Sequence, residues 1–171
     1  MIQRCVVRHG PPQDPTACYG WLDIALAEAP RLTAERLTLP SWALAKQTPL
    51  WSSPSLRCLE LAEMLAQGRA VHTDERLREL HFGAWEGQPW EHIERTQLDA
   101  WAADPFGFQM PGGESIPEFL ARCQAVWSAL PPQALVITHA GVIRSWWQLT
   151  RSEPLAEAFA RPIGYGEVIT F

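Results

Sequence analysis

Residues 3–12, QRCVVRHGPP, place the tightest constraint on the fold of this chain. The apolar run CVV at 5–7 stops abruptly at Arg8 and His9, and a glycine and two prolines follow. A short, continuous apolar run bounded in this way is typical of a strand buried on both faces of a parallel sheet. In such sheets, ligands bind beyond the carboxyl ends of the strands. The cation and the imidazole at this strand end are therefore candidate binding groups.

Short β-like runs alternate with helical periodicity along the rest of the chain. This alternation predicts an α/β fold with a mainly parallel sheet. A length of 171 residues suits one hydrophobic core, so residues 1–171 are predicted to form a single domain. We expect strands at residues 2–7, 49–52, 70–73, 135–138 and 168–171, and helices at 29–37, 55–67, 90–102, 116–130 and 142–149.

Two of the predicted helices carry clear end signals. Gly68 follows the helix at 55–67 as a candidate C-cap. Ser115 and Glu118 have the spacing of a capping box, and Pro117 falls in the first turn of the next helix. That helix then carries one apolar stripe, which we assign to the core: Phe119, Leu120, Cys123, Val126, Trp127 and Leu130.

Composition argues against several classes of function. The net charge of −5 and the pI of about 5.5 disfavour a nucleic-acid or anionic-membrane partner. No segment reaches the roughly 20 apolar residues of a membrane span, and Arg8 interrupts the pattern of a signal peptide. The four cysteines lack C-x-x-C spacing, and the five histidines lack His-x-x-x-His spacing. We therefore expect a cytoplasmic chain with free thiols and no metal or other cofactor.

Four loops near the predicted strand ends contain residues suited to phosphate chemistry. Arg8 and His9 follow the first strand, Arg57 comes shortly after the second, and His139 follows the fourth. Glu79 lies in the loop after the third strand. Because the carboxyl ends of parallel strands share one edge of a sheet, these five side chains are expected to converge on one point.

Such a set of side chains suits covalent phosphoryl transfer. Two guanidinium groups hold a tetrahedral dianion through charge-assisted hydrogen bonds. A neutral imidazole, whose ordinary pKa is about 6.5, can attack phosphorus at neutral pH, and a carboxyl group can protonate the departing alkoxide. The result is a phosphohistidine that water then hydrolyses. Taken singly, each residue has a plainer interpretation: a solvated turn for the Arg-His pair, a core or capping histidine, and a surface glutamate.

Five sequence motifs, taken together and in this order, resemble the histidine phosphatase superfamily over nearly the whole chain. They are VVRHG at 6–10, SSPSLRC at 52–58, LRELHFGAWEG at 77–87, PGGES at 111–115 and VITHAGVIR at 136–144. The resemblance implies a phosphoglycerate-mutase-like fold, which is a three-layer α/β/α sandwich. It also implies a phosphoric monoester hydrolase of the histidine acid phosphatase type, acting on a small-molecule phosphomonoester.

The resemblance assigns roles to the residues of the four loops. It implies that His9 is the phosphorylated nucleophile and that Glu79 is the proton donor. Arg8, Arg57 and His139 resemble the phosphate pocket, and His139 thereby also takes part in catalysis. Glu86, in the same motif as Glu79, is the rival candidate for the acid.

Two further stretches resemble a narrower group, the alpha-ribazole phosphatases of cobalamin assembly. These stretches are CYGWLDIAL at 18–26 and FGAWEGQPW at 82–90. The resemblance implies dephosphorylation of alpha-ribazole 5′-phosphate or of adenosylcobalamin 5′-phosphate. The compact chain leaves little room for the lid of the longer mutases, which favours transfer of the phosphoryl group to water. A broad-specificity or sugar-phosphate phosphatase and a non-catalytic phospho-ligand binding module remain alternatives, and the oligomeric state is open.

The chain also departs from the pattern of the superfamily. Many members follow Arg-His-Gly with Glu-Thr and then Asn, which add polar contacts to the phosphate. Here Pro11, Pro12 and Gln13 follow instead, so those contacts come from elsewhere or are missing.

Several other residues are candidates for substrate binding. Trp21, Trp85 and Trp90 fall in loops near the predicted pocket, where they can stack on a flat base, although ordinary packing is the alternative. Gly113 and Ser115 can bring backbone N–H groups toward an anion, although capping alone explains Ser115. Arg144 lies more than one turn beyond His139 and is expected to pair with a surface carboxylate.

Overall fold

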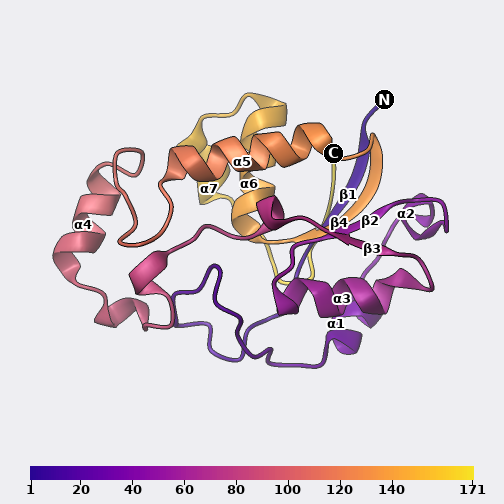
Figure 1. The fold of residues 1–171 in the computed structure, drawn as a ribbon, viewed down its shortest axis with the longest axis horizontal. Helices are drawn as coiled ribbons and strands as arrows, with labels where there is room; N and C mark the ends of the chain where they lie inside the picture. The colour runs from indigo at the N-terminus through magenta and orange to yellow at the C-terminus, as the bar shows by residue number, and fades with distance from the viewer.

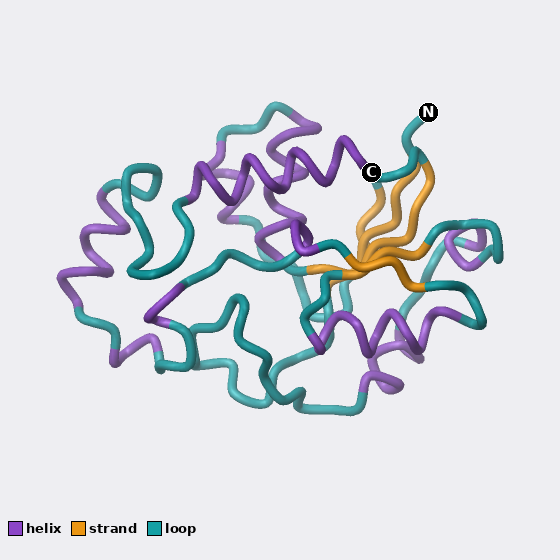
Figure 2. The backbone as a smooth tube through the Cα atoms, in the orientation of Figure 1, coloured by secondary structure: helices purple, strands orange, loops and turns teal.

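The computed structural model describes all 171 residues and contains a five-stranded sheet in the order β3-β2-β4-β1-β5. Strands β1 to β4 run parallel to one another, and β5 runs antiparallel to β1 at one edge. The mainly parallel sheet that the sequence predicts is therefore confirmed (Figures 1 and 2). The strands are β1 Gln3–Arg8, β2 Leu50–Ser52, β3 Val71–Thr73, β4 Gln133–Thr138 and β5 Val168–Thr170.

Helices cover both faces of this sheet, which makes the three-layer α/β/α sandwich (Figure 1). One face carries α5, α6 and α7, and the other carries α1, α2 and α3, while α4 lies at a distance from the sheet. The helices are α1 Pro30–Arg36, α2 Ser41–Leu44, α3 Leu56–Ala66, α4 Arg95–Ala103, α5 Ile116–Ala129, α6 Ala140–Arg151 and α7 Leu155–Ala160.

The continuous apolar runs of the central strands reflect burial on both faces. Side chains alternate along a strand, so Val6 and Val136 join the core beneath α5 and α6. Their neighbours Cys5 and Leu135 join the second core, beneath α3. A strand exposed on one face would instead alternate apolar and polar residues.

Most predicted elements agree with the structure to within two residues, but one helix is broken. The helix expected at 90–102 is a 3₁₀ turn, Trp90–His92, followed by α4 from Arg95. Between them Ile93 is extended and buried in the core, whereas α4 has no buried residue. Burial of Ile93 therefore interrupts the helical periodicity. The sequence did not indicate the short helices α2 and α7.

The predicted end signals have mixed outcomes. The capping box of Ser115 and Glu118 is confirmed at the start of α5, and the apolar stripe of that helix packs into the core as predicted. At the end of α3, Gln67 is the C-cap, with a left-handed φ of 48°. Gly68 comes one position later, with φ of 85°, so the prediction for Gly68 was displaced by one residue.

The register of the sheet brings three strand ends to one edge. Arg8 of β1 pairs with Thr138 of β4, and Ser52 of β2 pairs with Ile137. The segments after β1, β2 and β4 therefore begin side by side. Since β5 runs the other way, the loop before it, at residues 161–167, reaches the same edge. None of the helices combines the length and the apolar character that crossing a bilayer requires.

Candidate active site

The sheet edge brings together the two histidines and one of the two arginines that the motifs single out. The ring centroids of His9 and His139 lie 5.2 Å apart, with the rings edge to face. Nη2 of Arg57 lies 3.3 Å from Nδ1 of His139. All three side chains are buried. Three loops that are far apart in sequence thus meet around one point.

His9 follows the last residue of β1 and lines a cavity. Its Nδ1 lies 2.7 Å from the carbonyl oxygen of Gly10, so Nδ1–H donates and Nε2 carries the lone pair of the neutral ring. Burial lowers the pKa of His9 well below its ordinary value, and the charges of Arg57 and Arg8 lower it further, against the opposing effect of the Gly10 carbonyl. His9 is therefore an unprotonated base at neutral pH.

His139 is the N-cap residue of α6. A guanidinium group can only donate, so Nδ1 of His139 accepts from Arg57. The opposite nitrogen, Nε2, lies 2.8 Å from Oγ of Ser53 and in the neutral ring donates to it. Burial lowers the pKa of His139 well below its ordinary value, followed by the charge of Arg57.

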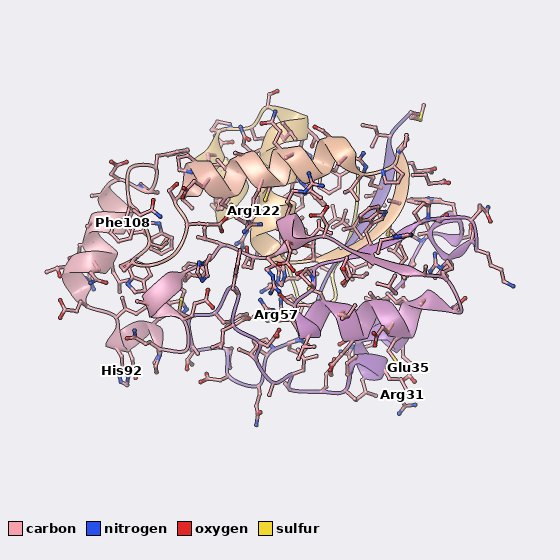
Figure 3. The ribbon with its side chains drawn as sticks, viewed as in Figure 1. Arg31, Glu35, Arg57, His92, Phe108 and Arg122 are labelled. Carbon is pink, nitrogen blue, oxygen red and sulfur yellow. The ribbon has the colours of Figure 1, made fainter.

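Arg57 comes from the first turn of α3 and points into the centre of the molecule, whereas Arg31 and Glu35 lie at its outer edge (Figure 3). Its Nη1 donates to the carbonyl of Leu22 at 3.0 Å, and its Nη2 donates to that of Gly20 at 2.6 Å. These bonds fix the loop between β1 and α1 beside the histidines. The Nε of Arg57 is buried and has no hydrogen-bond partner.

Arg8 is the last residue of β1, and it lines the same cavity as His9. Its guanidinium donates to the carbonyl of Ile163 in the loop before β5. The guanidinium carbon lies 3.7 Å from the ring centroid of Tyr165, which is a cation–π contact. Its Nε, like that of Arg57, is buried without a partner.

Glu79 lines the cavity from the loop after β3. Its Oε2 accepts the backbone N–H of Gly141 at 3.0 Å, and its Oε1 accepts that of Leu80 at 3.0 Å. Gly141 is the second residue of α6, so the carboxylate satisfies a donor at the N-terminus of this helix. A Cβ on Gly141 would lie 2.1 Å from Oε1 of Glu79. Only glycine leaves room for the carboxylate at this position.

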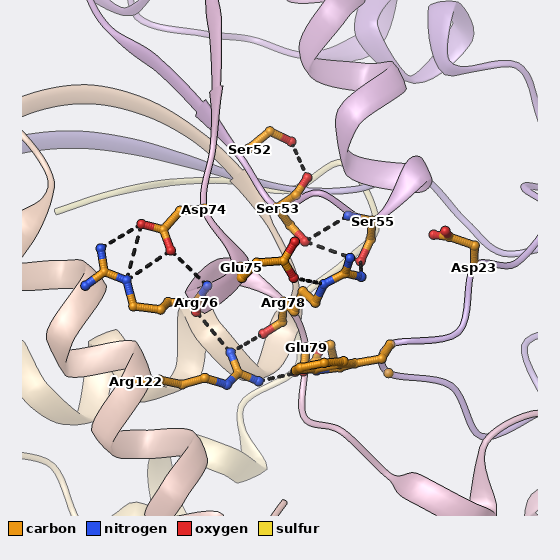
Figure 4. Close-up of polar contacts among 12 residues, drawn as sticks. Asp23, Ser52, Ser53, Ser55, Asp74, Glu75, Arg76, Arg78, Glu79 and Arg122 are labelled. Atoms are coloured by element: carbon orange, nitrogen blue, oxygen red, sulfur yellow. Dashed lines mark hydrogen bonds and ion pairs between the residues drawn. The ribbon is translucent and has the colours of Figure 1, made fainter. Parts of the chain in front are cut away.

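Arg122 of α5 holds the backbone that precedes and includes Glu79 (Figure 4). Its Nη1 donates to the carbonyls of Arg76 and Arg78 at 3.0 and 2.6 Å, and its Nη2 donates to that of Glu79 at 2.7 Å. Its Nε pairs with Glu114. This residue was not among the predicted site residues, because an arginine on the polar face of a helix has no local signal of such a role.

Glu86, the rival acid, is engaged elsewhere. Its two carboxylate oxygens accept the backbone N–H groups of Trp21 at 3.0 Å, Leu22 at 2.5 Å and Phe82 at 3.0 Å. It does not line the cavity. Glu86 therefore joins two loops through hydrogen bonds, whereas Glu79 lines the cavity that His9 also lines.

The cavity itself has a volume of about 310 Å³ and has a polar and an apolar part. Polar side chains gather around the strand ends, and aromatic side chains extend the cavity toward the segment at residues 82–101. The polar lining residues are Arg8, His9, Tyr19, Glu79, Arg144 and Tyr165. The other lining residues are Pro15, Ala17, Leu80, Phe82, Trp90, Trp101, Ile116, Phe119, Ala140, Gly141 and Phe159.

Of the three tryptophans expected near the pocket, Trp90 lines the cavity, together with Trp101, whereas Trp21 and Trp85 do not. Trp85 is 2% exposed, and its Nε1 donates to Gln97 at 2.7 Å, so it belongs to the core. Trp21 packs on His81 and donates from Nε1 to the carbonyl of Glu79. The planes of Trp90 and Trp101 differ by only 11°.

Gly113 and Ser115 also lie outside the lining. A Cβ on Gly113 would lie 2.2 Å from the carbonyl oxygen of His81, so glycine allows two backbone segments to approach. Ser115 caps α5, accepting the backbone N–H of Glu118. Backbone packing at Gly113 and helix capping by Ser115 therefore account for both residues without a ligand.

The prediction that Arg144 pairs with a surface carboxylate was wrong. Arg144 lines the cavity instead, and its Nε donates to the carbonyl of Arg161 at 3.0 Å. Burial lowers its pKa. Tyr19 and Tyr165 were likewise missed, although Gly20 follows Tyr19 and glycines stand on both sides of Tyr165 in the sequence. No group of three or more His, Cys, Asp or Glu side chains has the arrangement of a metal site.

Comparisons with known proteins identify the family. Residues 5–171 match the sequence profile of the histidine phosphatase superfamily (branch 1). Phosphoglycerate mutase-like protein 4 of Arabidopsis thaliana is 30% identical over 160 residues, which cover 85% of this chain and 70% of that protein.

Solved structures with a similar fold include a phosphoglycerate mutase. The crystal structure of phosphoglycerate mutase from Thermus thermophilus has a TM-score of 0.76 and 29% identity, with 99% of this chain and 92% of that chain covered. A putative alpha-ribazole-5′-P phosphatase from Escherichia coli has a TM-score of 0.82 at 18% identity, with coverage of 99% and 89%, and thus shares the fold. With its motifs, its sheet and nearly its full length in agreement, this chain belongs to the histidine phosphatase superfamily.

Proposed function

We propose that this chain is a phosphomonoesterase that acts through a phosphohistidine at His9. The observation that carries the proposal is that His9 lines the cavity while its Nδ1, and not its Nε2, is engaged in a hydrogen bond. The ring is neutral, its Nδ1 is held by Gly10, and it shares one cavity with Arg8 and Glu79. The ring of His139 lies beside that of His9, and Arg57 contacts His139, although neither Arg57 nor His139 lines the cavity.

In the first half of the proposed reaction, Nε2 of His9 attacks phosphorus and the ester O–P bond breaks. Glu79 in its acid form gives a proton to the departing oxygen. Arg8, Arg57 and His139 stabilise the charge that develops on the phosphoryl oxygens. The alcohol leaves, and the phosphoryl group stays on His9.

In the second half, water attacks the phosphohistidine. Glu79, now a carboxylate, takes the proton from the water, the N–P bond breaks, and inorganic phosphate leaves. His9 returns to its neutral form and Glu79 to its acid form, so atoms and charges balance over the cycle.

The substrate we propose is alpha-ribazole 5′-phosphate or the corresponding cobalamin phosphate. The aromatic part of the cavity, with Phe82, Trp90 and Trp101, suits a flat base at a short distance from the phosphate. The motifs at 18–26 and 82–90 and the name of the Escherichia coli protein of the same fold agree with this choice. The second candidate is a phosphatase of sugar phosphates, which the six polar lining residues can accommodate.

Labelling of the protein tests the proposal. Brief incubation with a ³²P-labelled phosphomonoester should leave an acid-labile label on the wild type, and the protein should hydrolyse p-nitrophenyl phosphate. His9→Asn should lose both properties. His92→Asn, which changes an exposed histidine with a 67% accessible side chain, should keep both. A label that persists in His9→Asn contradicts the mechanism, and tight binding of phosphate without turnover in the wild type would indicate a binding module.

A side-by-side series of substrates tests the choice of ester. The kcat/KM for alpha-ribazole 5′-phosphate should exceed those for ribose 5-phosphate and for other sugar phosphates. Equal values across the series would favour the broad-specificity alternative.

A further inference from the structure

Two tyrosines from opposite ends of the chain meet at the phosphate end of the cavity. The hydroxyl oxygens of Tyr19 and Tyr165 lie 3.0 Å apart, and both residues line the cavity that contains His9. They are the only two tyrosines in the chain.

Each tyrosine ring also lies beside one of the two arginines. The ring centroid of Tyr165 lies 3.7 Å from the guanidinium carbon of Arg8, and that of Tyr19 lies 5.1 Å from the guanidinium carbon of Arg57. The centroids of the Tyr165 and His9 rings are 5.7 Å apart. Both hydroxyls are thus attached to rings that contact the proposed phosphate-binding groups.

The backbone on either side holds both rings in place. Gly20, next to Tyr19, accepts from Arg57, and a Cβ there would lie 1.8 Å from the carbonyl oxygen of Leu80. Gly166, next to Tyr165, donates its N–H to the carbonyls of Arg8 and His9 and has a φ of 70°. Positions fixed in this way suit ligand contacts that need a defined geometry.

The segment after Gly10, in contrast, has no donor to offer. Pro11 and Pro12 have no backbone N–H, and the N–H of Gln13 is used in a hydrogen bond to the carbonyl of Ala25 at 2.9 Å. The side chain of Gln13 is exposed. Residues 11–13 therefore supply no neutral hydrogen-bond donor to the site.

We propose that Tyr19 and Tyr165 bind the phosphoryl group through their hydroxyls and so supply the neutral donors that the loop at 11–13 lacks. The proposal rests on the assignment of this cavity to a phosphomonoester. In the free protein one hydroxyl donates to the other. When the phosphoryl group binds, each hydroxyl turns its proton to a phosphoryl oxygen, and the bond between the tyrosines is replaced by two charge-assisted bonds. Burial and the bond to Tyr165 raise the pKa of Tyr19, so its hydroxyl remains a donor.

Equilibrium binding of inorganic phosphate, measured by isothermal titration calorimetry, tests this proposal without requiring turnover. Tyr19→Phe and Tyr165→Phe each keep the aromatic ring and remove only the hydroxyl. Each single variant should raise the Kd for phosphate about fivefold, because it loses one hydrogen bond to a charged group but no longer has the bond between the tyrosines to break. The double variant loses both bonds to the phosphate and should raise the Kd about a hundredfold. Ser128→Ala, which removes an exposed hydroxyl on α5 that bonds to Gln124, should leave the Kd unchanged.

A purely structural role predicts a different pattern. If the hydroxyls only bind each other, the two single variants and the double variant lose the same bond. All three should then show the same fall in melting temperature and an unchanged Kd for phosphate, which would overturn the proposal. A wild type without saturable phosphate binding would also overturn it. Failure of the catalytic proposal shows differently: no label forms on His9, while the tyrosine variants still weaken phosphate binding.

Discussion

The carboxylate of Glu79 accepts the backbone N–H of Gly141 at 3.0 Å and thereby occupies the N-terminus of α6. A Cβ at position 141 would lie 2.1 Å from Oε1 of Glu79 and 3.1 Å from Cζ of Phe119. Gly141→Ala should therefore displace the proposed acid from the cavity. We expect kcat for an alkyl phosphate to fall about 100-fold, the lower end of the range for loss of a general acid. Steady-state kinetics measure this.

The leaving group distinguishes loss of the acid from general damage. Because p-nitrophenolate departs without a proton, Gly141→Ala should slow p-nitrophenyl phosphate much less than the alkyl ester. In a Glu79→Gln background, Gly141→Ala should have little further effect on the alkyl ester, since the acid is already absent. Equal losses on both esters, or losses that add fully in the double variant, would contradict the role given to Glu79.

The two buried histidines should make stability depend on pH. The pKa values of His9 and His139 in the folded chain lie well below the ordinary value of 6.5. Between the folded and unfolded values only the unfolded chain binds these protons, so the free energy of unfolding is highest above pH 6.5 and falls as the pH decreases below it. Each histidine should contribute a slope of about 1.4 kcal/mol per pH unit.

Urea denaturation at several pH values between about 7.5 and 5.5, on either side of the ordinary histidine pKa, measures this slope. His139→Asn should reduce the slope by the contribution of one histidine, about 1.4 kcal/mol per pH unit. A free energy of unfolding that stays constant over this interval in the wild type would show that neither imidazole is held neutral by the fold.

The parts of the site that the sequence predicted have local signals. A buried strand that ends in a charged or imidazole side chain, such as Arg8-His9 or Thr138-His139, shows both where the strand stops and which groups lie at the sheet edge. Because ligands bind at the carboxyl edge of such sheets, the side chains at these strand ends are expected to lie close together. Arg57 and Glu79 were added by the order of the motifs, since neither position is distinctive alone.

The parts that the sequence did not predict depend on long-range geometry. Tyr165 reaches the site because β5 runs antiparallel to β1, and no pattern within residues 161–167 specifies that direction. Of the tryptophans expected near the pocket, Trp90 lines the cavity whereas Trp85 is buried in the core, although both sit on short 3₁₀ turns, Gly83–Trp85 and Trp90–His92. Such turns have no periodicity from which a buried face can be read.

Ser115 provides a test that separates capping from ligand binding. Its Oγ accepts the N–H of Glu118 at 3.3 Å, while the carboxylate of Glu118 accepts from Ser115 N at 2.8 Å. Ser115→Ala should lower the free energy of unfolding by about 1 kcal/mol and leave kcat/KM unchanged. Ser128→Ala, a change of the same kind within the same helix, should alter stability by less than about 0.5 kcal/mol. If kcat/KM falls in Ser115→Ala but not in Ser128→Ala, Ser115 does contribute to substrate binding.

The two tryptophans that line the cavity should set the preference for the leaving group. Trp90→Leu removes an aromatic surface from the wall but leaves the strand ends unchanged. We expect KM for alpha-ribazole 5′-phosphate to rise about 10-fold, as loss of aromatic stacking together with buried area implies, while KM for ribose 5-phosphate stays constant. Trp21→Leu, at a 37% exposed residue outside the lining, should change both substrates equally. Because the ratio of the two KM values is insensitive to partial unfolding, an unchanged ratio in Trp90→Leu would show that this wall does not contact the base.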